Sequence, residues 1–479
     1  MNDLFSADGW LNRVVTASND FLWTYILIAL LIGCALWFTV RSHGVQFRMI
    51  GEMFRLLTDS ATTGTSGLND KHAEHKHISS FQAFAVSVAT RVGTGNLAGV
   101  ATAITIGGPG AVFWMWVIAL LGSASAFVES TLAQLFKKRE KDSFIGGPAY
   151  YILKGLRTPW LAALFAILIS ITFGLSYNSI QSNTICNALN VAFGFNPTVV
   201  GVVLAVLSLV VIFGGIHRIA KVSSVIVPVM AIGYLILALF VIFRHIDLIP
   251  QVFTLIFKDA FGITQIAGGG IAATLMNGIK RGLFSNEAGE GSAPNVAATA
   301  STSHPVKQGL IQALGVFTDT LVVCSCTAFI ILFSGVDAQG GLNGIALTQA
   351  ALEAEVGRFG TVFVAAAILL FAYSSIIGNY YYGEANIRFL TKKKWVMTVY
   401  RLLAGGVVII FGALSSLDLV WSIGDFCMAT LTACNLYAIA RLSKYAFRLL
   451  EDYRAQKKAG KNPVFHRASM PELDLECWE

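Results

Sequence analysis

An apolar run from Ile78 to Ile106 is long enough to cross a lipid bilayer, yet its middle contains residues that break helices. A spanning helix needs roughly 20 residues, each rising about 1.5 Å. Gly93 and Gly95 flank Thr94 in this run, and each glycine costs a helix about 1 kcal/mol relative to alanine. Non-helical backbone at membrane depth occurs only where protein or a cavity satisfies its polar groups. The run therefore predicts an interrupted helix whose break faces a ligand, with a close helix crossing as the alternative.

The composition places this run in a polytopic membrane protein. Of the 479 residues, 55% are hydrophobic and 13% are charged, whereas soluble domains have about 25% charged residues. The net charge of +7 comes from basic loops and does not indicate a nucleic-acid partner. The seven cysteines show no metal-ligand spacing, so we expect them to be apolar fillers.

Eleven apolar segments predict an all-α protein with about 11 transmembrane helices. They cover residues 22–40, 79–106, 111–136, 160–191, 199–213, 222–243, 263–279, 307–333, 361–386, 396–414 and 417–440. Basic residues are concentrated in alternate loops and in the tail. The positive-inside rule therefore predicts an extracellular N-terminus and a cytoplasmic C-terminus.

The ten spans after the first predict two repeats of five. A second glycine-rich break, Gly268–Gly270, lies in the first span of the second set. Because five is odd, the two repeats enter the membrane in opposite senses, and paired breaks in inverted repeats point to a transporter binding site. We expect an extra helix with its flanking segments over 1–78, repeats over 79–245 and 246–442, and a cytoplasmic tail over 443–479.

The first break offers groups for two kinds of ligand. The backbone amides of Thr94 and Gly95 and the side chain of Asn96 suit a substrate carboxylate, because amides freed at a helix N-terminus attract anions. The carbonyls of Ala89 and Val92, just before the break, suit a small cation. By the same reasoning, Gly269 in the second break is a predicted substrate contact.

Polar residues in other spans extend this prediction, each with an alternative. The adjacent hydroxyls of Ser374 and Ser375 either complete an oxygen cage for sodium or donate to carbonyls nearby. Gln181 is either a substrate contact or an interhelical hydrogen bond. The segment 281–291 is either an inner gate or an ordinary cytoplasmic loop, and residues 334–358 are expected to form a long loop.

Several stretches of the chain resemble the alanine-or-glycine:cation symporter family. They are residues 93–96, 98–100, 107–116, 282–289, 304–309 and 380–384. The resemblance implies the leucine-transporter fold with one extra leading helix, and sodium-coupled import of a small neutral amino acid, alanine or glycine, across the bacterial inner membrane. The substrate contacts and sodium ligands that it implies are Thr94, Gly95, Asn96 and Gln181, and Ala89, Val92, Ser374 and Ser375.

Three positions depart from the family pattern. Many members have tryptophan where this chain has Asn379, and threonines where it has Ser374 and Ser375. Losing a bulky ring at a pocket wall would admit a larger, more polar substrate, so glutamine becomes a rival to alanine. Glu290 stands where an apolar residue is expected, and the sequence does not account for it.

Two other classes of function are disfavoured. An ion channel would not need paired breaks with amide-bearing residues nearby. An enzyme is not expected, because the spans contain no Ser/His pairing, no His-Glu-x-x-His and no paired Asp motif, and the histidines lie in loops or at span ends.

Overall fold

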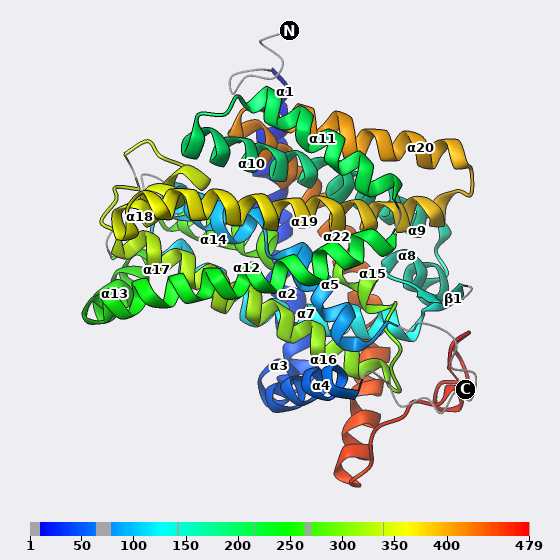
Figure 1. Cartoon of the computed structure of the whole chain (residues 1–479). Coiled ribbons are helices and arrows are strands. Elements are labelled where there is room, and N and C mark those ends of the chain that lie inside the picture. The colour runs from blue at the N-terminus through cyan, green and yellow to red at the C-terminus, as the bar shows by residue number, and fades with distance from the viewer. Residues whose placement is uncertain are drawn as a thin grey trace.

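The computed structural model describes residues 10–63, 78–140, 143–214, 216–263, 270–338 and 340–478, and most of them are helical (Figure 1). The helices are α1 (Trp10–Phe21), η1 (Leu22–Leu27), α2 (Ile28–Arg41), α3 (Val45–Arg48), α4 (Ile50–Thr63), α5 (Ser80–Arg91), η2 (Gly95–Gly99), α6 (Val100–Gly107), α7 (Ala111–Leu135), α8 (Pro148–Tyr151), η3 (Ile152–Leu156), α9 (Pro159–Ile171), η4 (Thr172–Tyr177), α10 (Asn178–Phe193) and α11 (Pro197–Phe213). The second part of the chain forms α12 (Ile216–Arg244), η5 (Ile246–Leu248), α13 (Ile249–Ala260), α14 (Gly270–Asn286), α15 (Ala293–Ala297), α16 (Pro305–Val316), η6 (Phe317–Cys324), α17 (Ser325–Phe333), α18 (Ile345–Val356), α19 (Arg358–Leu390), α20 (Lys394–Leu402), η7 (Leu403–Val407), α21 (Val408–Leu414), α22 (Leu417–Lys458) and η8 (Arg467–Ser469). A short antiparallel hairpin joins β1 (Lys138–Glu140) to β2 (Ser143–Ile145).

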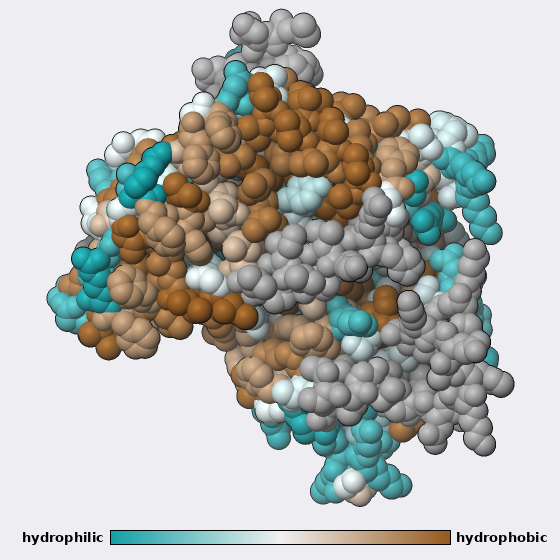
Figure 2. Space-filling model, viewed as in Figure 1, coloured by the Kyte–Doolittle hydropathy of each residue, from teal (hydrophilic) through white to brown (hydrophobic). Residues whose placement is uncertain are grey.

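Seven helices in the described ranges are long and apolar enough to cross a membrane, or eight if a pair bent by 74° within 230–260 is one span. Each of the eleven predicted segments has a helix at its place, although several of these helices are too short or too interrupted to count by length alone. Apolar side chains cover much of the surface in Figure 2, whereas hydrophilic residues gather at the lower end, where α22 ends in Figure 1. This distribution suits a protein surrounded by lipid over its middle.

The predicted break in the second span is confirmed. A capping box begins α5: Ser79 accepts from the backbone of Gln82, whose side chain accepts from the backbone of Ser79. The helix ends at Arg91, and Val92 has the extended backbone angles φ −71° and ψ 102°. Helix resumes as a π-helical turn, η2, and continues as α6. The amide of Val92 still donates to the carbonyl of Val88 (2.8 Å), whereas the amides of Gly93 and Thr94 donate to side chains, and all three residues are buried.

The break predicted at Gly268–Gly270 falls mostly outside the described residues, and the described part of the chain shows an interruption after Asn286. Gly268 and Gly269 fall outside the described residues, and Gly270, with φ +63°, is the first residue of α14. The helix then continues to Asn286, so helical structure extends beyond the predicted end of the span at residue 279. The chain leaves the helix at Glu287, which has φ +56°, and forms turns before α15 begins.

The segment after this interruption is not a cytoplasmic loop. Residues 281–304 are buried throughout, which overturns the ordinary-loop interpretation of 281–291. The expectation of a long loop over 334–358 was also wrong, because α18 occupies its second half. The tail packs back on the protein after α22: the amide of Phe465 donates to the carbonyl of Ser303 (2.9 Å), and the indole of Trp478 donates to the carbonyl of Leu135 (3.2 Å).

Candidate functional site

The break in the second span is fastened by the side chain of Asn96. Its Oδ1 accepts from the amide of Gly93 (2.9 Å), which satisfies one of the backbone groups that the break frees. Its Nδ2 donates to Oδ1 of Asp319 (2.7 Å) and to Oγ of Ser285 (3.1 Å). Asn96 therefore ties the break to α14 and η6, and its amide group is already occupied by protein partners.

Asp319 is a buried carboxylate with a full set of donors. Its Oδ2 accepts from the hydroxyls of Ser285 (2.6 Å) and Thr320 (3.0 Å), in addition to the bond from Asn96. All of these residues are inaccessible to solvent. A buried carboxylate needs such partners, because burying an unpaired charge is costly. Ser285 was missed from the sequence; its only signal was a position in a polar stretch next to an apolar helix.

Gln181 on α10 reaches the break from the other side. Its Oε1 accepts from the hydroxyl of Thr94 (2.6 Å) and, at 3.3 Å, from the amide of Thr94. Of the predicted substrate contacts, Thr94 and Gln181 are thus brought into direct contact. Gly95 lies beside them, packed against Ser285 and the ring of Phe284. Their role in substrate binding stays a prediction.

The serines of α19 lie against the carbonyl side of the break. Ser374 donates to the carbonyl of Ala89 (3.3 Å) or of Phe371 (2.8 Å). Ser375 donates to the carbonyl of Thr90 (3.1 Å) or of Phe371 (3.0 Å). The structure shows the second alternative for these serines, because each hydroxyl has one acceptor in its own helix and one at the end of α5. Their role as sodium ligands stays a prediction.

This arrangement suits a small monovalent cation. Two hydroxyl oxygens and two carbonyl oxygens lie close together, and hard cations such as sodium prefer oxygen ligands. Neutral oxygens bind the ion without the strong charge that would hold it too tightly for transport. The contacts involve Ala89 as predicted and Thr90, which was not predicted. Val92 is buried in the extended turn that follows.

Space at the break is too tight for any side chain at Gly93. A Cβ atom there would lie 2.6 Å from Oγ of Ser375 and 3.3 Å from Oε1 of Gln181. Gly93 therefore lets α5, α10 and α19 meet at one point. This close approach explains the glycine better than backbone freedom does.

Asn379 lies one helical turn beyond Ser375 on α19 and is 1% exposed. Within the described part of the chain its Nδ2 has no hydrogen-bond partner. The adjacent Gly378 packs on Thr90, because a Cβ at Gly378 would collide with the threonine side chain. Asn379 thus follows a residue that packs on the end of α5. Its role in substrate binding stays a prediction. Gly269 lies outside the described residues.

The remaining charges in the spans are mostly paired. Arg281 donates to Oδ2 of Asp425 (2.5 Å), and Glu384 accepts from Arg388 (2.7 Å) and Arg401 (3.0 Å). These pairs account for the carboxylates of Asp425 and Glu384 within their helices.

Comparison with known proteins places the chain in a family. The family model described as the sodium:alanine symporter family matches residues 8–467. The chain is 52% identical to a probable sodium/glutamine symporter, GlnT, of Bacillus subtilis over 98% of this chain and 96% of that protein. It is 50% identical to the amino-acid carrier protein AlsT of the same organism, over 98% of each. It is 36% identical to the sodium/alanine symporter AgcS of Methanococcus maripaludis, over 90% and 94%.

A solved structure supports the fold. A manganese transporter of Eremococcus coleocola aligns with a TM-score of 0.50 at 16% identity, covering 83% of this chain and 84% of that one. The likeness concerns the arrangement of helices alone. With the family match across nearly the whole chain, it follows that this protein is a membrane transporter and not an enzyme, and that it belongs to the sodium:alanine symporter family.

Proposed function

We propose that this protein imports glutamine together with sodium. The observation that carries the choice of substrate is Asn379, whose buried Nδ2 has no partner among the described residues. A free donor beside the break suits a substrate with a polar side chain, because leaving a buried donor unpaired is costly. The probable function of the similar Bacillus subtilis protein, sodium/glutamine symport, agrees with this choice.

Alanine is the second candidate substrate. The family takes its name from alanine, and AgcS of Methanococcus maripaludis is named as a sodium/alanine symporter. The carboxylate of alanine would bind the backbone amides at the break in the same way as that of glutamine. Its methyl side chain, however, would leave Nδ2 of Asn379 without a hydrogen-bond partner. We therefore place it second.

The proposed mechanism joins the two ligands at the break. Sodium binds the carbonyls of Ala89 and Val92 and the hydroxyls of Ser374 and Ser375, and it stabilises the end of α5. The substrate carboxylate then binds the amides of Thr94 and Gly95, with Gln181 released from Thr94 to contact the substrate. Each ligand raises the affinity for the other by the same factor. A membrane potential of 100 mV contributes about 2.3 kcal/mol for each charge carried inward.

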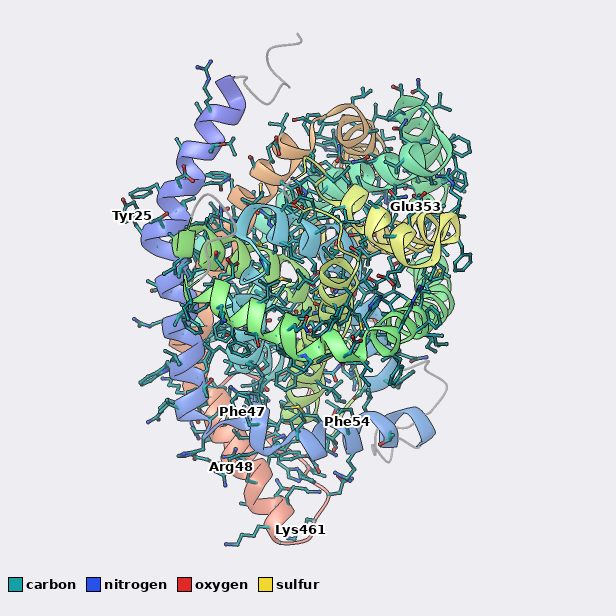
Figure 3. All side chains as sticks on the ribbon, turned by 90° about the vertical axis from the view of Figure 1, so that its left-hand side faces the viewer. Tyr25, Phe47, Arg48, Phe54, Glu353 and Lys461 are labelled. Atoms are coloured by element: carbon teal, nitrogen blue, oxygen red, sulfur yellow. The ribbon has the colours of Figure 1, made fainter. Side chains whose placement is uncertain are left out.

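The proposed architecture is an inverted 5+5 repeat of eleven spans, with 79–245 and 246–442 as the repeats, between an extra N-terminal helix and a C-terminal tail. Interruptions after Arg91 and after Asn286, in the helices that begin the two repeats, support it. An odd number of spans is supported by Figure 1, where α1 lies at the top and α22 ends at the bottom. Figure 3 shows the same separation along the molecule, with Glu353 of α18 far from Lys461, which follows α22. The basic residues of alternate loops support an extracellular N-terminus.

Uptake into proteoliposomes tests the function. Purified protein is reconstituted, a sodium gradient and a negative internal potential are imposed, and accumulation of labelled glutamine and labelled alanine is followed. We expect glutamine to accumulate only with the inward sodium gradient, and to displace labelled alanine in competition. Sodium current without any amino acid, with no saturable uptake, would instead indicate a channel.

A further inference from the structure

Glu290 is a buried carboxylate with only half of its hydrogen-bonding capacity used. It lies in the interruption between α14 and α15 and is 0% exposed. The hydroxyl of Tyr177 donates to Oε2 of Glu290 (3.0 Å). Oε1 has no partner in the described part of the chain. Leaving a buried acceptor unpaired destabilises the folded protein. We therefore expect this oxygen to accept a hydrogen bond from a bound ligand.

The charged groups around Glu290 do not contact its Oε1, although Nε and Nη2 of Arg91 also have no hydrogen-bond partner among the described residues. Those that act on it are Glu287, Glu129 and Arg91. Glu287 accepts from the hydroxyl of Ser292. Glu129 accepts from Nδ2 of Asn435 (2.8 Å). Arg91 donates from Nη1 to the carbonyl of Gln312 (3.4 Å) and forms no ion pair with a described carboxylate. None of these groups therefore binds Oε1 of Glu290.

A short chain of aromatic contacts connects Glu290 to the break. The ring of Tyr177 packs on the ring of Phe284, with centroids 4.7 Å apart. Phe284 in turn packs against Gly95, at 3.1 Å from the place of a Cβ atom on that glycine. Tyr177 also precedes Gln181 by four residues, which is one helical turn of about 5.4 Å. Tyr177 and Phe284 thus connect Glu290 to the proposed carboxylate site through side-chain contacts.

The same aromatic cluster extends to the side of Asn379. Phe173 packs on Tyr177 (4.7 Å between centroids) and on Tyr382 (5.3 Å). The hydroxyls of Tyr382 and Thr90 are hydrogen-bonded at 2.8 Å, and Thr90 packs on Gly378, next to Asn379. A free buried donor and a free buried acceptor therefore flank one group of rings beside the break.

A primary carboxamide accepts through its oxygen and donates through its N–H groups, and these two groups offer a donor for the oxygen and an acceptor for one N–H. We propose that the side chain of a bound glutamine is held between Asn379 and Glu290: Nδ2 of Asn379 donates to the substrate oxygen, and the substrate nitrogen donates to Oε1 of Glu290. The inference rests on the proposed function. We also expect the site to disfavour glutamate, because a carboxylate side chain has no hydrogen to donate to Oε1 of Glu290 and leaves that acceptor unpaired.

Two substitutions of Glu290 test the proposal in the reconstituted full-length protein, with displacement of labelled alanine in sodium as the readout. Glu290→Met removes the acceptor, and we expect the ratio of glutamine affinity to alanine affinity to fall roughly 10- to 100-fold. Glu290→Gln keeps a carbonyl acceptor in nearly the same shape. It is expected to retain the glutamine preference within about fivefold and to weaken the rejection of glutamate.

The outcomes separate the inference from the function on which it rests. If wild-type protein shows no sodium-dependent binding of any amino acid, the proposed function fails. If wild-type protein prefers glutamine but Glu290→Met leaves the glutamine-to-alanine ratio within twofold, the carboxamide site is overturned and the function stands. Should Glu290→Met not fold, judged by its melting temperature in detergent, the nearly isosteric Glu290→Gln decides: unchanged rejection of glutamate overturns the proposal.

Discussion

Replacing Gly93 by alanine should weaken sodium binding through a steric effect on Ser375. The new methyl carbon would lie 2.6 Å from Oγ of Ser375, well inside the carbon contact distance of about 3.5 Å. Ser375 must then turn away from the carbonyl of Thr90, which loses a hydrogen bond worth about 1 kcal/mol and forces a strained rotamer costing about 1 kcal/mol. The total of about 2 kcal/mol corresponds to roughly a 30-fold higher sodium concentration for half-maximal uptake.

The assay is substrate uptake into proteoliposomes as a function of external sodium. Gly33→Ala is the matched control, because a Cβ at this exposed glycine of α2 would meet no atom within 4 Å. A second variant combines Gly93→Ala with Ser375→Gly, which removes the clashing hydroxyl. Its half-saturating sodium concentration should be close to that of Ser375→Gly alone, because the alanine then has nothing to collide with. A half-saturation value for Gly93→Ala within twofold of wild type would refute the packing argument.

Three further substitutions probe the site and the tail. Ser375→Ala should raise the half-saturating sodium concentration roughly tenfold by removing one ligand oxygen, while Ser443→Ala, which removes a buried hydroxyl of α22 bonded only within its helix, should leave sodium dependence unchanged. Asp319→Ala should lower the melting temperature in detergent, because buried donors lose an acceptor at about 1–3 kcal/mol each; an unchanged melting temperature would contradict the network described. Trp478→Ala should release the tail and speed hydrogen exchange at the amide of Phe465 by roughly 100-fold, from a cost of about 3 kcal/mol for the lost ring; unchanged exchange would show that the indole does not hold the tail.

Local properties of the chain determined the class of protein and the first break. Apolar segments of spanning length predict helices, because lipid leaves the backbone no other way to satisfy its polar groups. Glycines at 93 and 95 predict an interruption, because each weakens the helix at its own position. Both inferences use neighbours within one segment, and the structure agrees with them.

Contacts between distant segments were decided only by the tertiary structure. The interruption after Asn286 was not predicted, and nothing local distinguished the buried stretch 287–304 from a polar loop. The hydrogen bond from Asn96 to Asp319 joins residues 223 positions apart in the sequence. The hydrogen bond from Ser374 to the carbonyl of Ala89 joins residues 285 positions apart. Helix formation depends on adjacent residues, whereas a ligand site of this kind exists only after packing brings such distant side chains together.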